Sequence, residues 1–148
     1  EKLQYDLTEA IRARDEVRSS TIRMALTAIK NEEVSGKEAR DLSDAEVITV
    51  LSREAKKRRE AAEAFEQAGA IDRAETEKAE GVIIAGYLPE QLSEAELKEM
   101  IASAIKETGA TGPQQMGLVM KSIQPKIAGR ADGGTVSSLV KAALSGGN

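Results

Sequence analysis

The sequence predicts an all-α protein, in which an N-terminal helical bundle of about four helices is followed by a C-terminal three-helix bundle. Two observations predict this class. Apolar residues recur every three or four positions along almost the whole chain, as on the buried stripe of an amphipathic helix. Capping patterns and helix breakers separate the periodic stretches. The β-branched run Val82-Ile83-Ile84 has no second strand to pair with, so a helix is expected there as well.

The N-terminal part is expected to hold four helices. Leu3, Leu7 and Ile11 form the apolar stripe of the first, and a second helix follows it. The third begins at a capping box, in which Ser43 and a glutamate three residues later each accept a hydrogen bond from a free backbone N–H. The fourth spans about residues 71–87.

The boundary between the two parts is expected in the segment 87–93. Pro89 interrupts the helical pattern, because its ring and its missing N–H cannot continue a helix. Ser93, with a glutamate three residues later, forms a second capping box. The predicted domains are therefore residues 1–88 and residues 93–148.

Three short helices are expected in the C-terminal domain. Pro113 is placed to open the second of them, since a proline is tolerated in the first helical turn, and Pro125 is expected to end it. Asp132 is the expected N-cap of the third, because its carboxylate can accept a hydrogen bond from the free N–H groups at a helix start.

Residue types that perform catalysis are scarce. The sequence has no His and no Cys, which removes the commonest general base near neutral pH and all thiolate chemistry. Two Ser-x-x-Lys pairs, Ser103 with Lys106 and Ser138 with Lys141, are simply neighbours on predicted helices and lack the companion motifs of a serine nucleophile. We therefore expect no intrinsic catalysis, no cofactor and no metal.

No apolar run approaches the roughly 20 residues that span a bilayer. The start of the sequence also lacks the charged and apolar regions of a secretory leader. A cytoplasmic protein without contact with a membrane is therefore expected.

Charge is distributed unevenly along the chain. Residues 1–86 carry 15 Lys and Arg against 19 Asp and Glu, whereas residues 111–148 carry four cations against one acid. Cations on a small bundle attract polyanions, and these four are the residues that would contact the phosphates if the partner were an RNA. They are Lys121, Lys126, Arg130 and Lys141. With only three aromatic residues in the chain, stacking on bases cannot be the main way of holding RNA.

The candidate binding loop spans residues 126–134. It contains three glycines and two cations just before a predicted helix start. Gly129 would let the backbone approach a partner closely, and a helix N-terminus offers free N–H groups to an anion. Asp132 argues against this interpretation, because as N-cap it would occupy the helix start itself.

The basic run from Arg53 to Arg59 lies on the third predicted helix. Most of its cations face solvent among glutamates, which is typical of a salt-bridged surface helix. Arg58 differs, because it falls on the apolar stripe. It extends along its apolar neighbours with its charge toward water, pairs with an acid of the second helix, such as Glu32 or Glu33, or faces a ligand as a groove residue. The sequence leaves these alternatives open.

Several motifs resemble the YqeY family, in order and over nearly the whole chain. They are Leu51-Ser52-Arg53-Glu54, Phe65-Glu66-Gln67-Ala68-Gly69, Tyr87-Leu88-Pro89-Glu90-Gln91-Leu92-Ser93, Met116-Gly117-Leu118-Val119-Met120, Pro125-Lys126 and Gly129-Arg130-Ala131-Asp132-Gly133. The sequence departs from the family pattern at Gln115, where an acid is expected, and at Gly134, where a longer polar residue is common.

The YqeY family is similar to the helical tail of the B subunit of glutamine-dependent tRNA amidotransferase, which helps that enzyme hold tRNA. The resemblance implies a tRNA-binding module linked to amidated aminoacyl-tRNA formation, related only by association to carbon–nitrogen ligase activity with glutamine as amido donor. It implies tRNA or another structured RNA as partner, with an amidotransferase or an aminoacyl-tRNA synthetase beside it. The alternative is a helical protein–protein adaptor with no RNA role, whose acidic N-terminal part would dock a partner. The pI of about 5.1 and the shortage of aromatic residues favour it.

Overall fold

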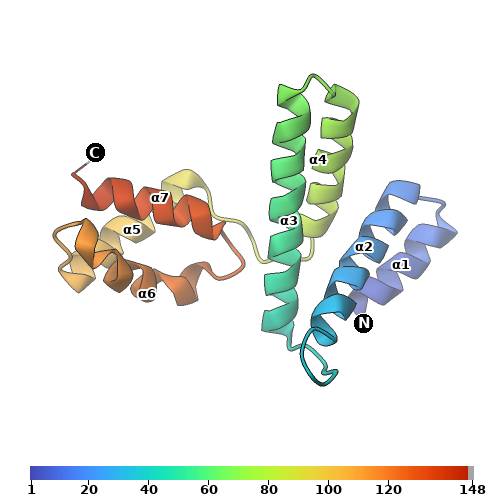
Figure 1. Cartoon of the computed structure of the whole chain (residues 1–148), viewed down its shortest axis with the longest axis horizontal. Helices are drawn as coiled ribbons and strands as arrows, with labels where there is room; N and C mark the ends of the chain where they lie inside the picture. Colours follow the sequence, from blue (N-terminus) through green and yellow to red (C-terminus); the bar gives the residue numbers. More distant parts are fainter. Residues whose placement is uncertain (147–148) are drawn as a thin grey trace. The chain divides into compact units, whose positions relative to one another are not determined.

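The structure, a computed structural model, describes residues 1–146 of the chain. These residues form seven α-helices and no strand, so the predicted all-α class is confirmed. The helices are α1 (Lys2–Arg12), α2 (Glu16–Glu33), α3 (Asp44–Gln67), α4 (Ile71–Ala85), α5 (Glu94–Thr108), α6 (Met116–Ile127) and α7 (Gly133–Leu144), with a 3₁₀ turn at Pro113–Gln115 (Figure 1).

The chain divides into two compact units, unit 1 from Glu1 to Pro89 and unit 2 from Glu90 on. Unit 1 consists of two helical hairpins, α1 with α2 and α3 with α4, and α2 also packs on both helices of the second hairpin. In unit 2 each of the helices α5, α6 and α7 packs on the other two.

The expected caps begin three of the helices. The Ser43 hydroxyl accepts a hydrogen bond from the Glu46 N–H at 3.2 Å, and the Glu46 carboxylate accepts one from the Ser43 N–H, which completes the capping box of α3. The Ser93 hydroxyl accepts from the Glu96 N–H at 3.1 Å at the start of α5, but the reciprocal bond to the Glu96 carboxylate is not formed, so the second predicted capping box is only half present. Asp132 accepts from the Thr135 N–H at 3.0 Å at the start of α7.

Two local predictions are wrong. Ile11, expected on the buried stripe of α1, is 49% exposed, and Ala10, at 3%, takes the inward position. Pro125, expected to end α6, lies inside this helix, which continues to Ile127. Ile127 is buried in the core of unit 2. Its burial holds the last turn in place and offsets the hydrogen bond that Pro125 cannot donate.

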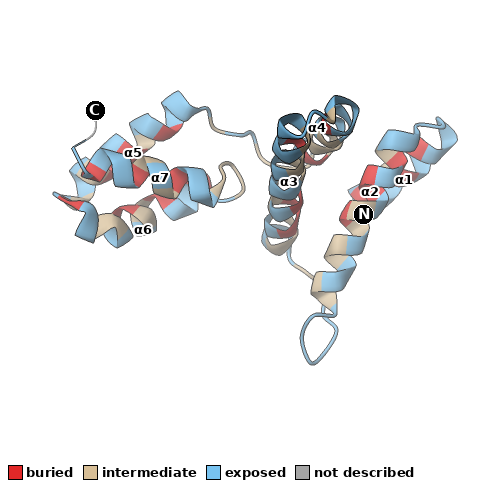
Figure 2. Cartoon of the chain, turned by 45° about the horizontal axis from the view of Figure 1, so that its top comes forward, coloured by how far each residue is buried: buried red, intermediate tan, exposed pale blue. Residues whose placement is uncertain are grey.

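The core of unit 2 is one continuous cluster. It contains ten buried residues from the three helices and the loop after α5, with Val119, Val136 and Val140 fully enclosed. Figure 2 shows the buried positions as stripes along the helices of this unit. The unit therefore has a hydrophobic core of its own.

Unit 1 has two smaller clusters instead. One lies between α1 and α2, and the other lies where α2, α3 and α4 meet. Ile29 and Tyr87, neither of them fully buried, pack against both clusters and connect them. The buried members are Leu3, Leu7 and Ile22 in the first cluster and Ala25, Leu51 and Ile84 in the second.

The segment 90–92, which lies between the two predicted domains, is hydrogen-bonded to the loop before α7. Leu92 also packs against the core of unit 2. Unit 2 therefore includes these three residues. The hydrogen bonds run from the Leu92 N–H to the Arg130 carbonyl at 2.9 Å, from Gln91 Nε2 to the Gly129 carbonyl at 2.8 Å, and from Arg130 Nε to the Glu90 carbonyl at 3.1 Å.

We expect a fragment of residues 90–148 to fold on its own, because its core is continuous. A fragment of residues 93–148 should be less stable by about 1–3 kcal/mol, since it lacks three hydrogen bonds that each contribute about 1 kcal/mol or less when partly exposed. Denaturant titrations followed by circular dichroism measure the difference. Poorly dispersed amide NMR signals and no cooperative unfolding in the longer fragment would contradict the prediction.

Candidate functional site

Three of the cations predicted to contact RNA share one property. Lys121 and Lys126 on α6 and Lys141 on α7 are exposed, and within residues 1–146 no ion pair involves any of them. Their charge is therefore not compensated by a carboxylate of the described chain. Such lysines are available to an external anion.

The basic run on α3 is different, because its cations have carboxylate partners. Arg53 lies 3.7 Å from Glu32, and Lys57 lies 3.2 Å from Glu54. Lys56 pairs with a glutamate one turn along the helix at 4.0 Å. These contacts fit the salt-bridged surface helix that the sequence favours, and they reduce the field that the run presents to a distant polyanion.

Gly129 and Arg130 have a structural role in addition to the RNA contact predicted for them. Gly129 has φ +74°, a backbone conformation that favours glycine, and its carbonyl accepts the Gln91 side chain. The Arg130 guanidinium donates to the carbonyls of Glu90 at 3.1 Å and of Lys126 at 3.4 Å. The loop thus holds the segment 90–92 against unit 2. Its part in binding RNA stays a prediction.

The N-terminus of α7 is occupied by its own cap. Asp132 accepts hydrogen bonds from both the N–H and the hydroxyl of Thr135 at 3.0 Å. A carboxylate at this position satisfies a free N–H group and occupies the positive end of the helix dipole. The sequence argument against an anion site at this helix start is supported.

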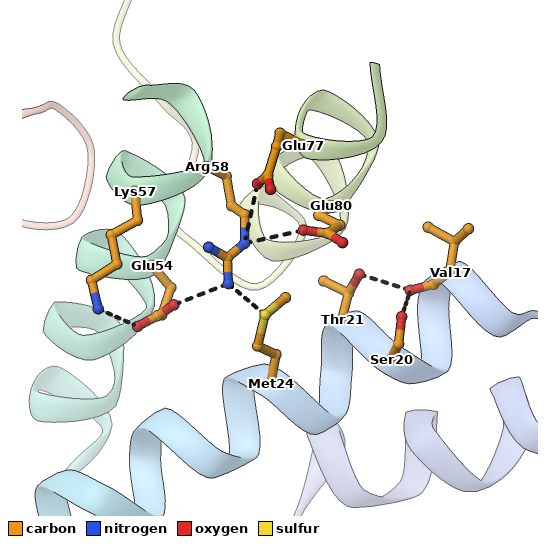
Figure 3. A network of polar contacts seen from close by, with 9 residues as sticks. All are labelled: Val17, Ser20, Thr21, Met24, Glu54, Lys57, Arg58, Glu77 and Glu80. Atoms are coloured by element: carbon orange, nitrogen blue, oxygen red, sulfur yellow. Dashed lines mark hydrogen bonds and ion pairs between the residues drawn. The ribbon is translucent and has the colours of Figure 1, made fainter. Parts of the chain in front are cut away.

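Arg58 lies at the centre of a polar network in unit 1 (Figure 3). Its side chain is only 13% exposed and faces carboxylates from two helices. Its Nη2 also donates to the sulfur of Met24 on α2. The carboxylate contacts are to Glu54 on its own helix at 3.4 Å, and to Glu77 at 3.7 Å and Glu80 at 3.2 Å on α4.

Arg58 forms the ion pairs that were one alternative from the sequence, but with other partners than those expected. Its contact with a ligand as a groove residue stays a prediction. Glu32, one of the acids proposed from the sequence, pairs with Arg53 instead. The partners on α4 were missed because sequence patterns favour neighbours on one helix and reveal little about which helices meet. The spacing of Glu77 and Glu80 by three residues was the available signal, since it places both on one face of α4.

The network holds more negative than positive charge. Three carboxylates surround one guanidinium, and Lys57, which also contacts Glu54, is mostly exposed. Burial and the neighbouring Glu77 raise the pKa of the Glu80 carboxyl, against the lowering influence of Arg58. The Nε of Arg58 and one Glu77 oxygen are within ion-pair distance but lack a hydrogen-bond partner.

Tyr87 forms a second polar link in unit 1. Its hydroxyl donates to Asp6 Oδ2 at 2.5 Å, and Lys2 Nζ donates to the same oxygen at 3.1 Å. The hydrogen bonds from Tyr87 and then Lys2 lower the pKa of the Asp6 carboxyl. Burial and the bond to Asp6 raise the pKa of Tyr87 to about 12. At neutral pH the pair therefore remains a phenol bound to a carboxylate.

Two features that residues 1–146 lack bear on the class of site. Within residues 1–146 no group of three or more acidic side chains is arranged to hold a metal ion, and the three carboxylates around Arg58 are no exception. In the same residues, no helix combines the length and apolarity needed to cross a membrane.

Comparison with known proteins decides the family. The family model described as "Yqey-like protein" matches residues 1–144. The chain belongs to the YqeY family. The match runs through unit 1 and through unit 2 as far as the end of α7.

Two curated relatives of this YqeY-family chain bear the same name, "Altered inheritance of mitochondria protein 41, mitochondrial". The relative from Lachancea thermotolerans is 30% identical over 145 residues, which cover 96% of this chain and 76% of the relative. The one from Clavispora lusitaniae is 32% identical over 143 residues, which cover 94% of this chain and 81% of the relative.

These relatives contradict the cytoplasmic location expected from the sequence, because both are named as mitochondrial proteins. The expectation rested on the lack of a leader and of a membrane-spanning segment. Neither absence separates one aqueous compartment from another. The sequence argument was therefore too weak for the conclusion drawn from it.

Replacing Arg58 by Ala should lower the free energy of unfolding by about 3–5 kcal/mol, because it leaves buried carboxylates without a counter-charge. The loss should be smaller near pH 5 than near pH 7.5. The pKa of the Glu80 carboxyl is already raised, and it rises further when Arg58 no longer lowers it. A carboxyl group whose pKa is raised in the folded state stabilises the fold at low pH, and this contribution is lost as the pH rises through the folded-state pKa. Denaturant titrations at both pH values measure this.

Arg53→Ala is the control, since this exposed arginine should contribute less than about 1 kcal/mol. Adding Glu80→Gln to Arg58→Ala should recover stability, whereas Glu80→Gln alone should reduce it. Equal losses for the two arginine variants would show that the buried network is not important for the fold.

Replacing Tyr87 by Phe should raise the pKa of the Asp6 carboxyl toward its usual value, because the largest lowering influence is the hydrogen bond from Tyr87. A carboxylate whose pKa is lowered in the folded state stabilises the fold at pH values above its pKa in the unfolded chain, which is about 4. This contribution is lost as the pH falls through the folded-state pKa. Titration of the Asp6 carboxyl carbon by NMR measures the shift. Tyr5→Phe, in an exposed ring, should leave it unchanged. An unchanged pKa in Tyr87→Phe would refute the assignment.

Proposed function

We propose that this YqeY-family protein is a non-catalytic accessory protein that binds tRNA or another structured RNA through unit 2. Lys121, Lys126 and Lys141 would contact phosphates. The observation that carries the proposal is the contrast between these exposed lysines, without ion pairs in residues 1–146, and the carboxylate-paired basic run of α3. The likeness of the family to the tail of the amidotransferase B subunit also supports it.

The same likeness suggests the setting of the proposed binding. It links the protein to the formation of amidated aminoacyl-tRNA, with an amidotransferase or an aminoacyl-tRNA synthetase as a protein partner. The names of the relatives suggest mitochondria as the compartment. The absence of His and Cys is the reason for proposing an accessory protein and not an enzyme acting alone.

Phosphate contacts predict how the binding responds to salt. Each phosphate that a lysine neutralises releases counterions, and with three such contacts the affinity should be micromolar or weaker, with a slope of log K against log salt of about −2 to −3. Different tRNAs should bind about equally, because phosphate contacts position the RNA without reading its sequence.

Replacing Lys121, Lys126 and Lys141 together by Ala should reduce this salt slope by about 2–3 and weaken all tRNAs to a similar extent. Fluorescence anisotropy with labelled tRNA at several salt concentrations measures both effects. Arg130 stays unchanged in this variant. Its replacement would also remove its hydrogen bond to the segment 90–92, so weaker binding could then come from a change in structure and not from a lost phosphate contact.

The matched control is the triple replacement of Arg53, Lys56 and Lys57 by Ala, which removes the same amount of charge from α3. We expect it to change tRNA affinity less. Loss of binding in the α3 variant but not in the lysine variant would place the site on unit 1. If the unmodified protein fails to bind tRNA even at low salt, the RNA proposal is wrong and the adaptor alternative is favoured.

A further inference from the structure

Unit 1 contains a groove that none of the predicted site residues lines. Its volume is about 930 Å³, and it lies where the start of α1, the second half of α2, the loop 41–42 and the first turns of α3 come together. This volume is at the upper end of the range for ligand pockets in proteins. Aliphatic side chains form much of its wall, among them Leu3, Leu26, Ile29, Val47, Ile48 and Leu51.

The groove lies over the junction between the two hydrophobic clusters of unit 1. Ile29 and Tyr87 connect these clusters, line the groove, and are only partly buried. Val47 and Ile48 at the start of α3 are also only partly buried. Apolar side chains inserted here would contact both clusters at once and remove this aliphatic surface from water, which is the main favourable contribution in protein association.

The rim of the groove is acidic. Asp41 and Asp44 line it, are exposed, and have no ion pair within residues 1–146. Lys2 is the one lysine or arginine side chain in the lining, and it is held by Asp6 at 3.1 Å. An apolar floor with an acidic rim is complementary to a segment that has an apolar stripe bordered by Lys or Arg.

We propose that this groove docks a basic amphipathic helix of a partner protein. A helix is the element that presents aliphatic side chains at i, i+3, i+4 and i+7 on one face and cations beside them, and the binding of such helices in apolar grooves is a common recognition mode. The proposal does not depend on RNA binding, because the groove belongs to unit 1 and the proposed phosphate contacts belong to unit 2.

The probe is a synthetic 18-residue helical peptide with a Leu stripe on one face and Lys or Arg on the other. Two further peptides test its features, one with the same composition but no stripe, and one with the same stripe but Glu in place of the cations. Fluorescence anisotropy with the full chain should show that the basic amphipathic peptide binds and that both comparison peptides bind at least about tenfold more weakly.

Two variants of the protein locate the contact. The double variant Asp41→Asn with Asp44→Asn should bind the basic peptide about two- to tenfold more weakly at low salt. The effect is modest because each exposed charge pair contributes little. Asp72→Asn with Glu63→Gln is the matched control. Asp72 stands in the first turn of α4 as Asp44 does in α3, both control residues are exposed, and neither lines the groove. The control should leave affinity within about twofold.

Ile48→Asn should remove peptide binding by placing a polar group in the apolar wall. Thermal unfolding shows whether the Ile48→Asn variant folds. If it does not, the test rests on the rim variant of Asp41 and Asp44 and on its matched control, because the side chains replaced there are exposed. The proposal is overturned if no peptide binds, if the acidic peptide binds as well as the basic one, or if the rim and control variants behave alike. It is also overturned if sedimentation shows the chain pairing with a second copy through Ile48, because the occupant would then be the protein itself.

Discussion

The guanidinium of Arg58 is the contact on which the arrangement of unit 1 depends. It lies between the two helices of the α3–α4 hairpin and touches α2 through Met24, so one side chain joins three of the four helices. The hydrophobic clusters of this unit are small and divided. A charged group is costly to bury and is tolerated only with partners. The carboxylates of α4 therefore fix how this helix faces α3, which aliphatic packing alone would leave less specific.

The sequence was most informative where the interaction is local. Ser43 and Asp132 were predicted as caps because the atoms they bond lie three residues away in the chain. The all-α class followed from periodicity in the same way. The errors have a different origin. Ile11 and Pro125 were misplaced because packing against other helices decides which face is buried and where a helix stops.

The candidate sites show the same division. Exposure of Lys121 and Lys141 could be predicted from helix geometry, since each stands away from the apolar stripe of its helix. The partners of Arg130 and Arg58 that lie far away in the chain or on another helix could not be predicted in this way. Glu90 is 40 residues from Arg130 in the chain, and the α4 acids reach Arg58 across a helix hairpin. No pattern within one helix encodes such contacts. The groove of unit 1 is likewise a product of three helices and a loop, and leaves no motif in the sequence.

The division of the unit 1 core also bears on how the native state fluctuates. Cooperative opening involves residues that lose their buried contacts together. In unit 2 the ten buried residues form one cluster, so no helix can leave the core without breaking contacts of the other two. In unit 1, by contrast, the α1–α2 contacts can open while Leu51 and Ile84 stay packed, because the α1–α2 cluster meets α4 and the segment after it only through the partly buried Ile83 and Tyr87. Amide protons of α1 are therefore expected to exchange with solvent through subglobal openings that leave the α3–α4 hairpin intact.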